Sequence, residues 1–174
     1  AFDELVTLIG RINPKFPQEL AEVESRAGVR VGGDIAAALG TDFTFSIERP
    51  TLPIPGWVAI VEVNQPAVLD SAVRRLADAA NREAAAAGAT PRLIVEDQQA
   101  EGRAWTVLRL TNINLTLSWT YDRGYWVMST DRALAAAAIA TRAGGFPLVR
   151  SAQFVAQLPA SAGLHQSAFL WLNT

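Results

Sequence analysis

Two stretches of the chain alternate strictly between apolar and polar residues, the pattern of a β-strand with one face in the core and one in water. The first covers residues 42–48, with Phe43, Phe45 and Ile47 on the apolar side and Asp42, Thr44, Ser46 and Glu48 on the polar side. The second covers residues 114–121, with Leu115, Leu117, Trp119 and Tyr121 on the apolar side and Asn114, Thr116, Ser118 and Thr120 on the polar side. Buried parallel strands would be apolar on both faces, so the alternation predicts an antiparallel sheet with both apolar sets in the core.

Other stretches also have strand character, and those between residues 92 and 130 are joined by short connections. Residues 57–63, WVAIVEV, are apolar at nearly every position, which predicts a central strand. Further strands are predicted at residues 92–96, 104–110, 125–130 and 168–172. Because short connections make neighbouring strands run antiparallel, we expect a mainly antiparallel sheet of about six or seven strands.

Helical periodicity and end signals predict the remaining elements. The longest helix covers residues 66–87 and is stopped by Gly88; its apolar residues recur at helical spacing. A short helix at residues 35–39 is predicted with Asp34 as its N-cap and Gly40 at its C-terminal end. Other helices are predicted at residues 2–12, 16–28, 131–142 and 151–158. The pattern predicts an α+β fold with helices packed on one face of the sheet, the longest across its apolar face.

The length of 174 residues fits one domain with a sizeable core, so residues 1–174 are expected to form a single domain. The chain begins AFDEL without an initiator methionine and ends at SAFLWLNT, which has the pattern of a strand with nothing after it. We therefore expect this domain to be a piece of a longer chain.

An aromatic cluster in residues 114–130 predicts a β-hairpin. The segment holds both tyrosines, the only methionine and two of the five tryptophans. Its turn is predicted to contain three residues, Asp122 to Gly124, with the glycine in the left-handed conformation. Trp119 lies on the apolar side, so core packing is favoured over a platform for a ligand. For Tyr125 and Trp126, which lie on opposite faces, both interpretations stay open.

Composition and charge exclude several classes of function. The formal net charge is −2 and the basic residues are scattered, so the chain lacks the clustered Lys and Arg that bind nucleic acid or anionic lipid. Cysteine is absent, which removes disulfides, thiol catalysis and thiolate metal sites. No run of apolar residues is long enough for a transmembrane segment. We expect no cofactor or metal, and a partner that is an unidentified protein or small molecule.

Three groups of residues invite a catalytic or ligand-binding interpretation, and each has a plainer one. The glycines of VGGD precede a helix, but Asp34 places a carboxylate where a bound phosphate would have to sit. His165, near Ser161 and Ser167, is the only histidine and has no second histidine, thiol or GxSxG motif to assist it. The carboxylates of Glu96, Asp97 and Glu101 fall where a hairpin is predicted to turn and fit no EF-hand spacing. Solvated loop residues are favoured in the last two cases, and no catalytic, cofactor or metal residue is assigned.

The sheet itself offers two candidate surfaces for a partner. The first is the polar strand face, made by Thr44, Ser46, Glu48, Thr116, Ser118 and Thr120. The second is an edge of the sheet, which pairs with an added strand where nothing covers it. For the polar face, a merely solvated surface is favoured over a binding role.

The order of features resembles a bacterial family of extracytoplasmic domains of unknown function, found in lipoproteins or membrane-tethered proteins. The stretches that carry the likeness are VGGDIAAALGTDFTFSIE, GWVAIVEVNQPAVLDSAVRRL, GYWVMSTDRALAAAA, PLVRSAQFVAQLP and SAFLWLNT, and they span most of residues 29–174. The resemblance implies an exported location, in the periplasm or cell envelope. It implies no activity and no functional residue.

Two hypotheses from different classes follow. The first is a non-catalytic binding or structural module of a bacterial cell-envelope protein. The alternative is a hydrolase or acid/base enzyme that uses Glu96, Asp97 and Glu101, with or without His165. Convergence of two of these carboxylates in an apolar cleft would favour the enzyme, whereas their separation on an open surface would remove its basis.

Overall fold

The computed structural model describes residues 2–49, 54–90, 93–145, 147 and 150–157. The chain divides into two compact units, Ala1–Ala135 and Ala136–Thr174, and each has its own description below. Of the helices in the described ranges, none has the length and apolar character that crossing a bilayer requires.

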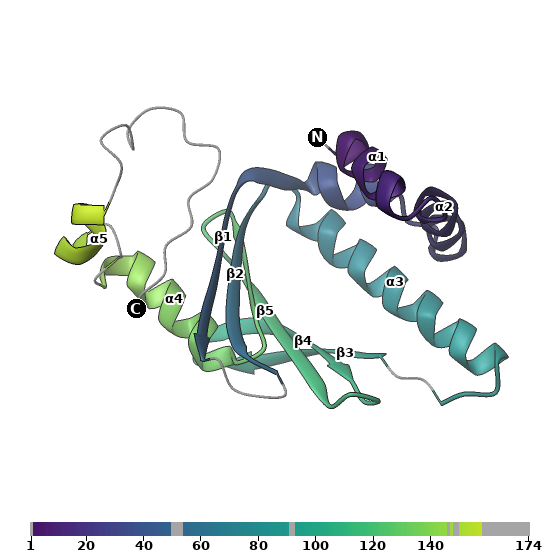
Figure 1. The fold of residues 1–174 in the computed structure, drawn as a ribbon. Coiled ribbons are helices and arrows are strands. Elements are labelled where there is room, and N and C mark those ends of the chain that lie inside the picture. The colour runs from purple at the N-terminus through teal and green to yellow at the C-terminus, as the bar shows by residue number, and fades with distance from the viewer. Residues whose placement is uncertain (1, 50–53, 91–92, 146, 148–149, 158–174) are drawn as a thin grey trace. The chain divides into compact units, whose positions relative to one another are not determined.

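The first unit is built on a six-stranded sheet in the order β1-β2-β6-β5-β4-β3 (Figure 1). Its strands are β1 (Leu39–Arg49), β2 (Gly56–Val63), β3 (Leu93–Ala100), β4 (Arg103–Leu110), β5 (Leu115–Asp122) and β6 (Tyr125–Ser129). Every neighbouring pair is antiparallel. The α+β class and the antiparallel sheet are therefore confirmed, while the strand predicted at residues 168–172 lies outside the described residues.

The helices also follow the sequence pattern closely. They are α1 (Phe2–Ile12), α2 (Phe16–Ala27), α3 (Pro66–Ala86), α4 (Arg132–Gly144) and α5 (Ala152–Gln157). Gly28 and Gly88 follow α2 and α3 with φ of 62° and 72°. Glycine adopts this left-handed conformation without steric cost, and so it ends both helices where the sequence indicates.

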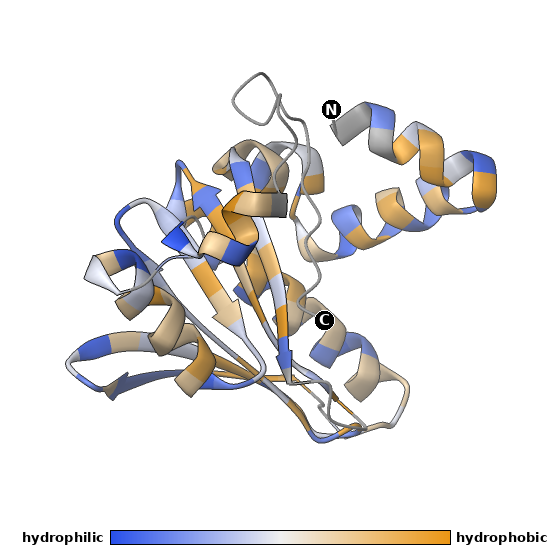
Figure 2. Ribbon diagram, turned by 60° about the vertical axis from the view of Figure 1, so that its left-hand side comes forward, coloured by the Kyte–Doolittle hydropathy of each residue, from blue (hydrophilic) through white to orange (hydrophobic). Residues whose placement is uncertain are grey.

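The core of the first unit lies where α3 packs on the apolar face of the sheet. Leu69 of α3 is buried with Val63 of β2 and Ala38, and the surrounding residues are Ile35, Leu39, Val68, Val73, Tyr121 and Trp126. A second cluster joins Ala27, Val29 and Ala72, which links α2 to α3. The prediction that the longest helix lies on the apolar face is correct for the middle of the sheet and its β3 side. Hydrophobic and hydrophilic positions alternate along the strands of the sheet (Figure 2).

Both described tight hairpins of the sheet turn on two residues. In the β5–β6 hairpin, Asp122 pairs with Tyr125, and the turn residues Arg123 and Gly124 have φ of 47° and 82°. Positive φ at both positions is the type I′ geometry, whose twist matches the flanking strands. The left-handed glycine is confirmed, but the turn is one residue shorter than predicted because Asp122 is still paired in β5. Glu101 and Gly102 form the equivalent turn between β3 and β4.

The segment before β1 differs from the short helix predicted at residues 35–39. It consists of a single π-helical turn, Val31–Ile35, and a 3₁₀ turn, Ala36–Ala38. Asp34 does not cap a following helix; its Oδ2 instead accepts the N–H of Arg30 at 2.9 Å. Gly40 lies within β1. The side chain of Glu62 crosses the place where a Cβ on Gly40 would stand, so a side chain at this position would require Glu62 to move.

The second unit contains most of α4 together with α5. Ile139 of α4 and Phe154 of α5 are both buried. The Oγ of Ser151 accepts the N–H of Phe154 at 3.4 Å, so Ser151 caps α5 as its sequence position indicates.

Candidate interaction surface on strand β1

The apolar side chains of β1 are exposed, although the sequence predicts them in the core. The exposed fractions of Phe43, Phe45 and Ile47 are 70%, 57% and 58%. The alternation correctly predicts that these side chains share one side of the strand. It does not predict that, among the described helices of this unit, none packs on this part of the sheet's apolar face. Isolated exposed apolar residues are common on proteins, but three on one strand face form a patch that needs a physical explanation.

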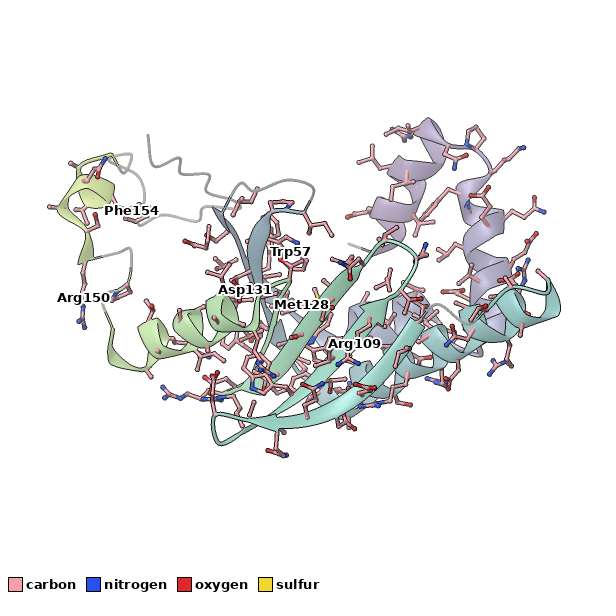
Figure 3. The ribbon with its side chains drawn as sticks, turned by 90° about the horizontal axis from the view of Figure 1, so that it is seen from below. Trp57, Arg109, Met128, Asp131, Arg150 and Phe154 are labelled. Carbon is pink, nitrogen blue, oxygen red and sulfur yellow. The ribbon has the colours of Figure 1, made fainter. Side chains whose placement is uncertain are left out.

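Trp57 extends this patch onto the neighbouring strand. It is the register partner of Ile47, and its ring centroid lies 5.7 Å from that of Phe45 with an interplanar angle of 34°. Figure 3 shows Trp57 at the β1–β2 end of the sheet. We call Phe43, Phe45, Ile47 and Trp57 the β1 patch.

The path of α3 explains why the β1 patch is uncovered. The helix begins directly after β2, where the hydroxyl of Tyr121 in β5 donates to the carbonyl of Pro66 at 3.3 Å. It then crosses toward β3, where Arg74 donates to Asp97 at 2.6 Å. Because α3 runs from the middle of the sheet toward β3, it does not extend over the apolar side of β1. Figure 1 shows α3 diverging from the β1–β2 pair.

The outer edge of β1 is one end of the sheet among the described residues. Pairing with β2 is regular from Phe43 to Ile47, with register shifts on both sides of this stretch. At the shift before Phe43, Oε2 of Glu62 accepts the N–H groups of Thr41 at 2.9 Å and Asp42 at 3.4 Å. The regularly paired part of the edge is therefore the part that carries the apolar residues.

The opposite edge, β3, is protected by side chains. Asn81 of α3 donates to the carbonyl of Leu93 at 2.6 Å and accepts its N–H at 3.0 Å, which satisfies backbone groups that an added strand would need. Charged side chains also line β3, with Glu96 and Asp97 next to each other in the strand. Covering and charging an edge are both ways in which proteins prevent unwanted strand pairing.

The polar strand face predicted as a possible open surface is not one surface. Ser118 and Thr120 are buried, at 7% and 3% exposed, and the hydroxyl of Thr120 donates to the carbonyl of Ala104 at 2.7 Å. Trp105 and Val107 of β4 lie beside them on the same face and are also buried. On β1, Thr44 and Glu48 are exposed, and Ser46 donates a hydrogen bond to Glu48.

The candidate carboxylates do not converge. Glu96 and Asp97 are consecutive in β3 and so point to opposite faces. Glu96 accepts from Arg109 at 2.8 Å, while Asp97 accepts from Arg74 and from Thr106 at 3.1 Å. The hydrogen bond from Arg74 holds the pKa of Asp97 below its ordinary value. Only Glu101 lies in the hairpin turn, so the prediction that all three belong to it is wrong; β3 extends four residues beyond its predicted end at Glu96.

The remaining sequence candidates give no ligand site in the described part of the chain. The carboxylate of Asp34 fills the space before the π-helical turn and lies 3.6 Å from Nη2 of Arg75, which leaves an anion no place there. A hollow along α1 is lined by Glu4, Thr7, Leu8 and Arg11, all from that one helix. Within the described residues, no group of three or more His, Asp or Glu side chains is placed to hold a metal. His165, Ser161 and Ser167 lie outside these residues.

The aromatic hairpin is core, with one exception at its tip. Trp119 is 2% exposed and packs edge-to-face on Trp126, with ring centroids 6.2 Å apart, so core packing is the correct interpretation for Trp119. Trp126 belongs to the cluster around Leu69. Tyr125 lies on the other face, and its hydroxyl is 3.5 Å from Oδ2 of Asp42.

Sequence reasoning identified the residues of the β1 patch and assigned them the wrong environment. The strand order would have predicted the exposure of these residues, since an end strand has a neighbour on one side only.

Comparison of the chain with protein-family models, curated protein sequences and solved structures finds no match.

Proposed function

We propose that this domain is a non-catalytic binding module of a bacterial cell-envelope protein. The observation that carries the proposal is the β1 patch, an exposed apolar surface beside a sheet edge with which no described strand pairs. Exposed apolar side chains in such a group are a cost in solubility, and they mark contact sites in many soluble proteins. A binding role would explain why these apolar side chains are exposed.

The environment of the carboxylates supports binding over the alternative, a carboxylate-dependent hydrolase or acid/base enzyme. Two carboxylates that act together as acid and base must both reach the same reacting bond. Glu96 and Asp97 lie on opposite faces of β3, and each is paired with an arginine. That arrangement is typical of ion pairs that tie a strand to its neighbours.

The location in the envelope rests on the resemblance of residues 29–174 to bacterial extracytoplasmic domains. Separating cells of the source organism into cytoplasmic, periplasmic and membrane fractions, and detecting the protein with an antibody, tests it. We expect the protein in the periplasmic or membrane fraction; a purely cytoplasmic protein would contradict the location and leave the binding role unaffected.

A thermal-shift screen against peptides, glycans, lipids and metal ions tests the binding role, because a ligand that binds the native state raises the unfolding midpoint. The variant Phe43→Ser/Phe45→Ser removes two side chains of the β1 patch. Ile94→Ser is the matched control, since Ile94 is an exposed apolar residue on β3 at the other edge.

We expect at least one ligand to raise the midpoint of the wild type and of Ile94→Ser but not that of the double variant. A shift that survives in the double variant would place binding elsewhere. Turnover of a hydrolase substrate that is abolished by Glu96→Gln or Asp97→Asn would instead establish the enzyme.

A further inference from the structure

We propose that the outer edge of β1, from Phe43 to Ile47, accepts an extended peptide strand whose residues alternate between bulky apolar and basic side chains. This inference rests on the proposed binding role and specifies its site and ligand. It depends on the backbone edge of β1 and on the side chains of the strand's two faces. The charges on β1 also oppose pairing with a second copy of the chain.

The backbone edge has the length and regularity that strand addition requires. The pairs Phe43–Val61, Thr44–Ile60, Phe45–Ala59, Ser46–Val58 and Ile47–Trp57 follow one another without interruption. A peptide added on the outer side of such a stretch forms main-chain hydrogen bonds along it, as in other cases of β-strand addition. Register shifts at both ends limit the site to this stretch.

The apolar face of β1 determines which residue type is favoured at every second position of the peptide. In an added strand every second side chain falls on this face, beside Phe43, Phe45 and Ile47. Because β2 pairs with β1 on its inner side, these side chains remain exposed toward the outer side of β1. Bulky apolar residues of the peptide remove that surface from water, which is the main source of binding free energy.

The other face of β1 sets the charge of the ligand. Asp42 and Glu48 both lie on it, one at each end of the regular stretch, and both are exposed. Their hydroxyl-bearing neighbours, Thr44 and Ser46, carry no charge to offset them. Cross-strand pairs of opposite charge are favourable and pairs of like charge are unfavourable, so this face favours Lys or Arg at the alternate positions of the peptide.

Charge also opposes a second copy of this chain as the occupant. Antiparallel pairing of two β1 strands with full overlap of the apolar stretch is centred on Phe45 and sets Phe43 opposite Ile47. In that register Asp42 of each copy faces Glu48 of the other, which creates two pairs of like charge. A register shifted by two residues avoids these pairs but shortens the apolar overlap.

Synthetic peptides test the inference directly. The probe KVKFKVK has apolar and basic residues in alternation, and EVEFEVE has the opposite charge on the same apolar pattern. Binding to the whole chain is measured by titration calorimetry at low salt. We expect KVKFKVK to bind and EVEFEVE to bind at least about tenfold more weakly, with the affinity for KVKFKVK falling as salt is added.

Variants locate the site and its charge. Phe45→Ser is expected to abolish binding of KVKFKVK, Asp42→Asn/Glu48→Gln to weaken it about tenfold, and Ile94→Ser to leave it unchanged. N-methylation of alternate peptide amides tests main-chain pairing: one of the two alternating patterns removes the donors that face β1 and should abolish binding.

Each other outcome overturns the inference in a distinct way. Binding that survives Phe45→Ser places the peptide elsewhere, and equal affinity for EVEFEVE removes the role of charge. Self-association of the chain in sedimentation, lost in Phe45→Ser, makes a second copy the occupant. If neither peptide binds while another ligand from the thermal-shift screen depends on Phe43 and Phe45, the peptide inference fails and the binding role stands.

Discussion

Gly40 and Glu62 show how one residue without a side chain shapes the start of β1. A Cβ on Gly40 would lie 2.1 Å from Oε2 and 2.4 Å from Cγ of Glu62, too close for any contact. The glutamate holds this place because its carboxylate accepts the N–H groups of Thr41 and Asp42 at the register shift. These residues therefore define the end of the regular edge.

Gly40→Ala is expected to reduce the free energy of unfolding by about 1–2 kcal/mol, because Glu62 must move and leave two backbone donors without their acceptor. Chemical denaturation followed by tryptophan fluorescence measures the loss. Gly33→Ala is the control, since its nearest contacts, to Arg30, are at 3.4 Å. If Gly40→Ala and Glu62→Ala were fully additive in the double variant, the proposed contact would be excluded.

Tyr121 gives the unfolding free energy a dependence on alkaline pH. Burial raises the pKa of its hydroxyl to about 12, from 10.0. Between these values the unfolded chain loses the proton and the folded chain keeps it, so stability falls as pH rises from about 10 to about 12. Tyr121→Phe should remove this contribution and flatten the decline. Urea midpoints measured at several pH values in this window provide the test, and identical slopes in both proteins would contradict it.

At the scale of elements, the β5–β6 hairpin depends on its two-residue turn. Gly124 has a φ of 82°, where a β-branched residue is strained and glycine is not. Gly124→Val is expected to cost about 1–3 kcal/mol, and Gly124→Asn less, because asparagine tolerates left-handed backbone. Thermal unfolding followed by circular dichroism ranks the variants, and equal midpoints for wild type and Gly124→Val would refute the turn geometry.

The pairing of α3 with β3 is the element contact that leaves β1 exposed. Arg74 bridges Asp70 of its own helix and Asp97 of β3, and Asn81 holds the backbone of Leu93. Hydrogen bonds to both carboxylates raise the pKa of Arg74 above its ordinary value. These contacts fix the C-terminal part of the helix over the β3 side of the sheet, at the far end of the strand order from β1.

At the scale of the whole chain, Trp119 and Phe45 exemplify a buried and an exposed aromatic residue with different expected roles. Trp119 is fully enclosed and Phe45 is largely exposed. Trp119→Ala should therefore cost about 3–5 kcal/mol of unfolding free energy, and Phe45→Ala less than about 1 kcal/mol. Denaturant unfolding of the two variants checks this. A large loss in Phe45→Ala would mean that the β1 patch supports the fold and would weaken its assignment as a binding surface.

Local signals in the sequence determined most of the elements and the way their faces are divided. Strict alternation set the strand character of β1 and β5, helical spacing with Gly88 set the extent of α3, and Gly124 set the position of a turn. These predictions hold because backbone periodicity, capping and left-handed glycine depend on residues within a few positions of one another. The sequence also showed that Phe43, Phe45 and Ile47 share a side.

The tertiary structure alone decided which of those faces is covered. Phe43 and Trp119 have the same alternating pattern, yet β1 is the end strand among the described residues, while β5 lies inside the sheet and its Tyr121 contacts the start of α3. Ser118 and Thr120, on the polar side of the same strand, are buried as well, beside Trp105 and Val107 of the neighbouring strand β4. Burial depends on strand order and on the path of a helix between strands far apart in the chain. An amphipathic pattern shows that a strand has an apolar side. Which segment covers that side depends on contacts between segments that are far apart in the chain.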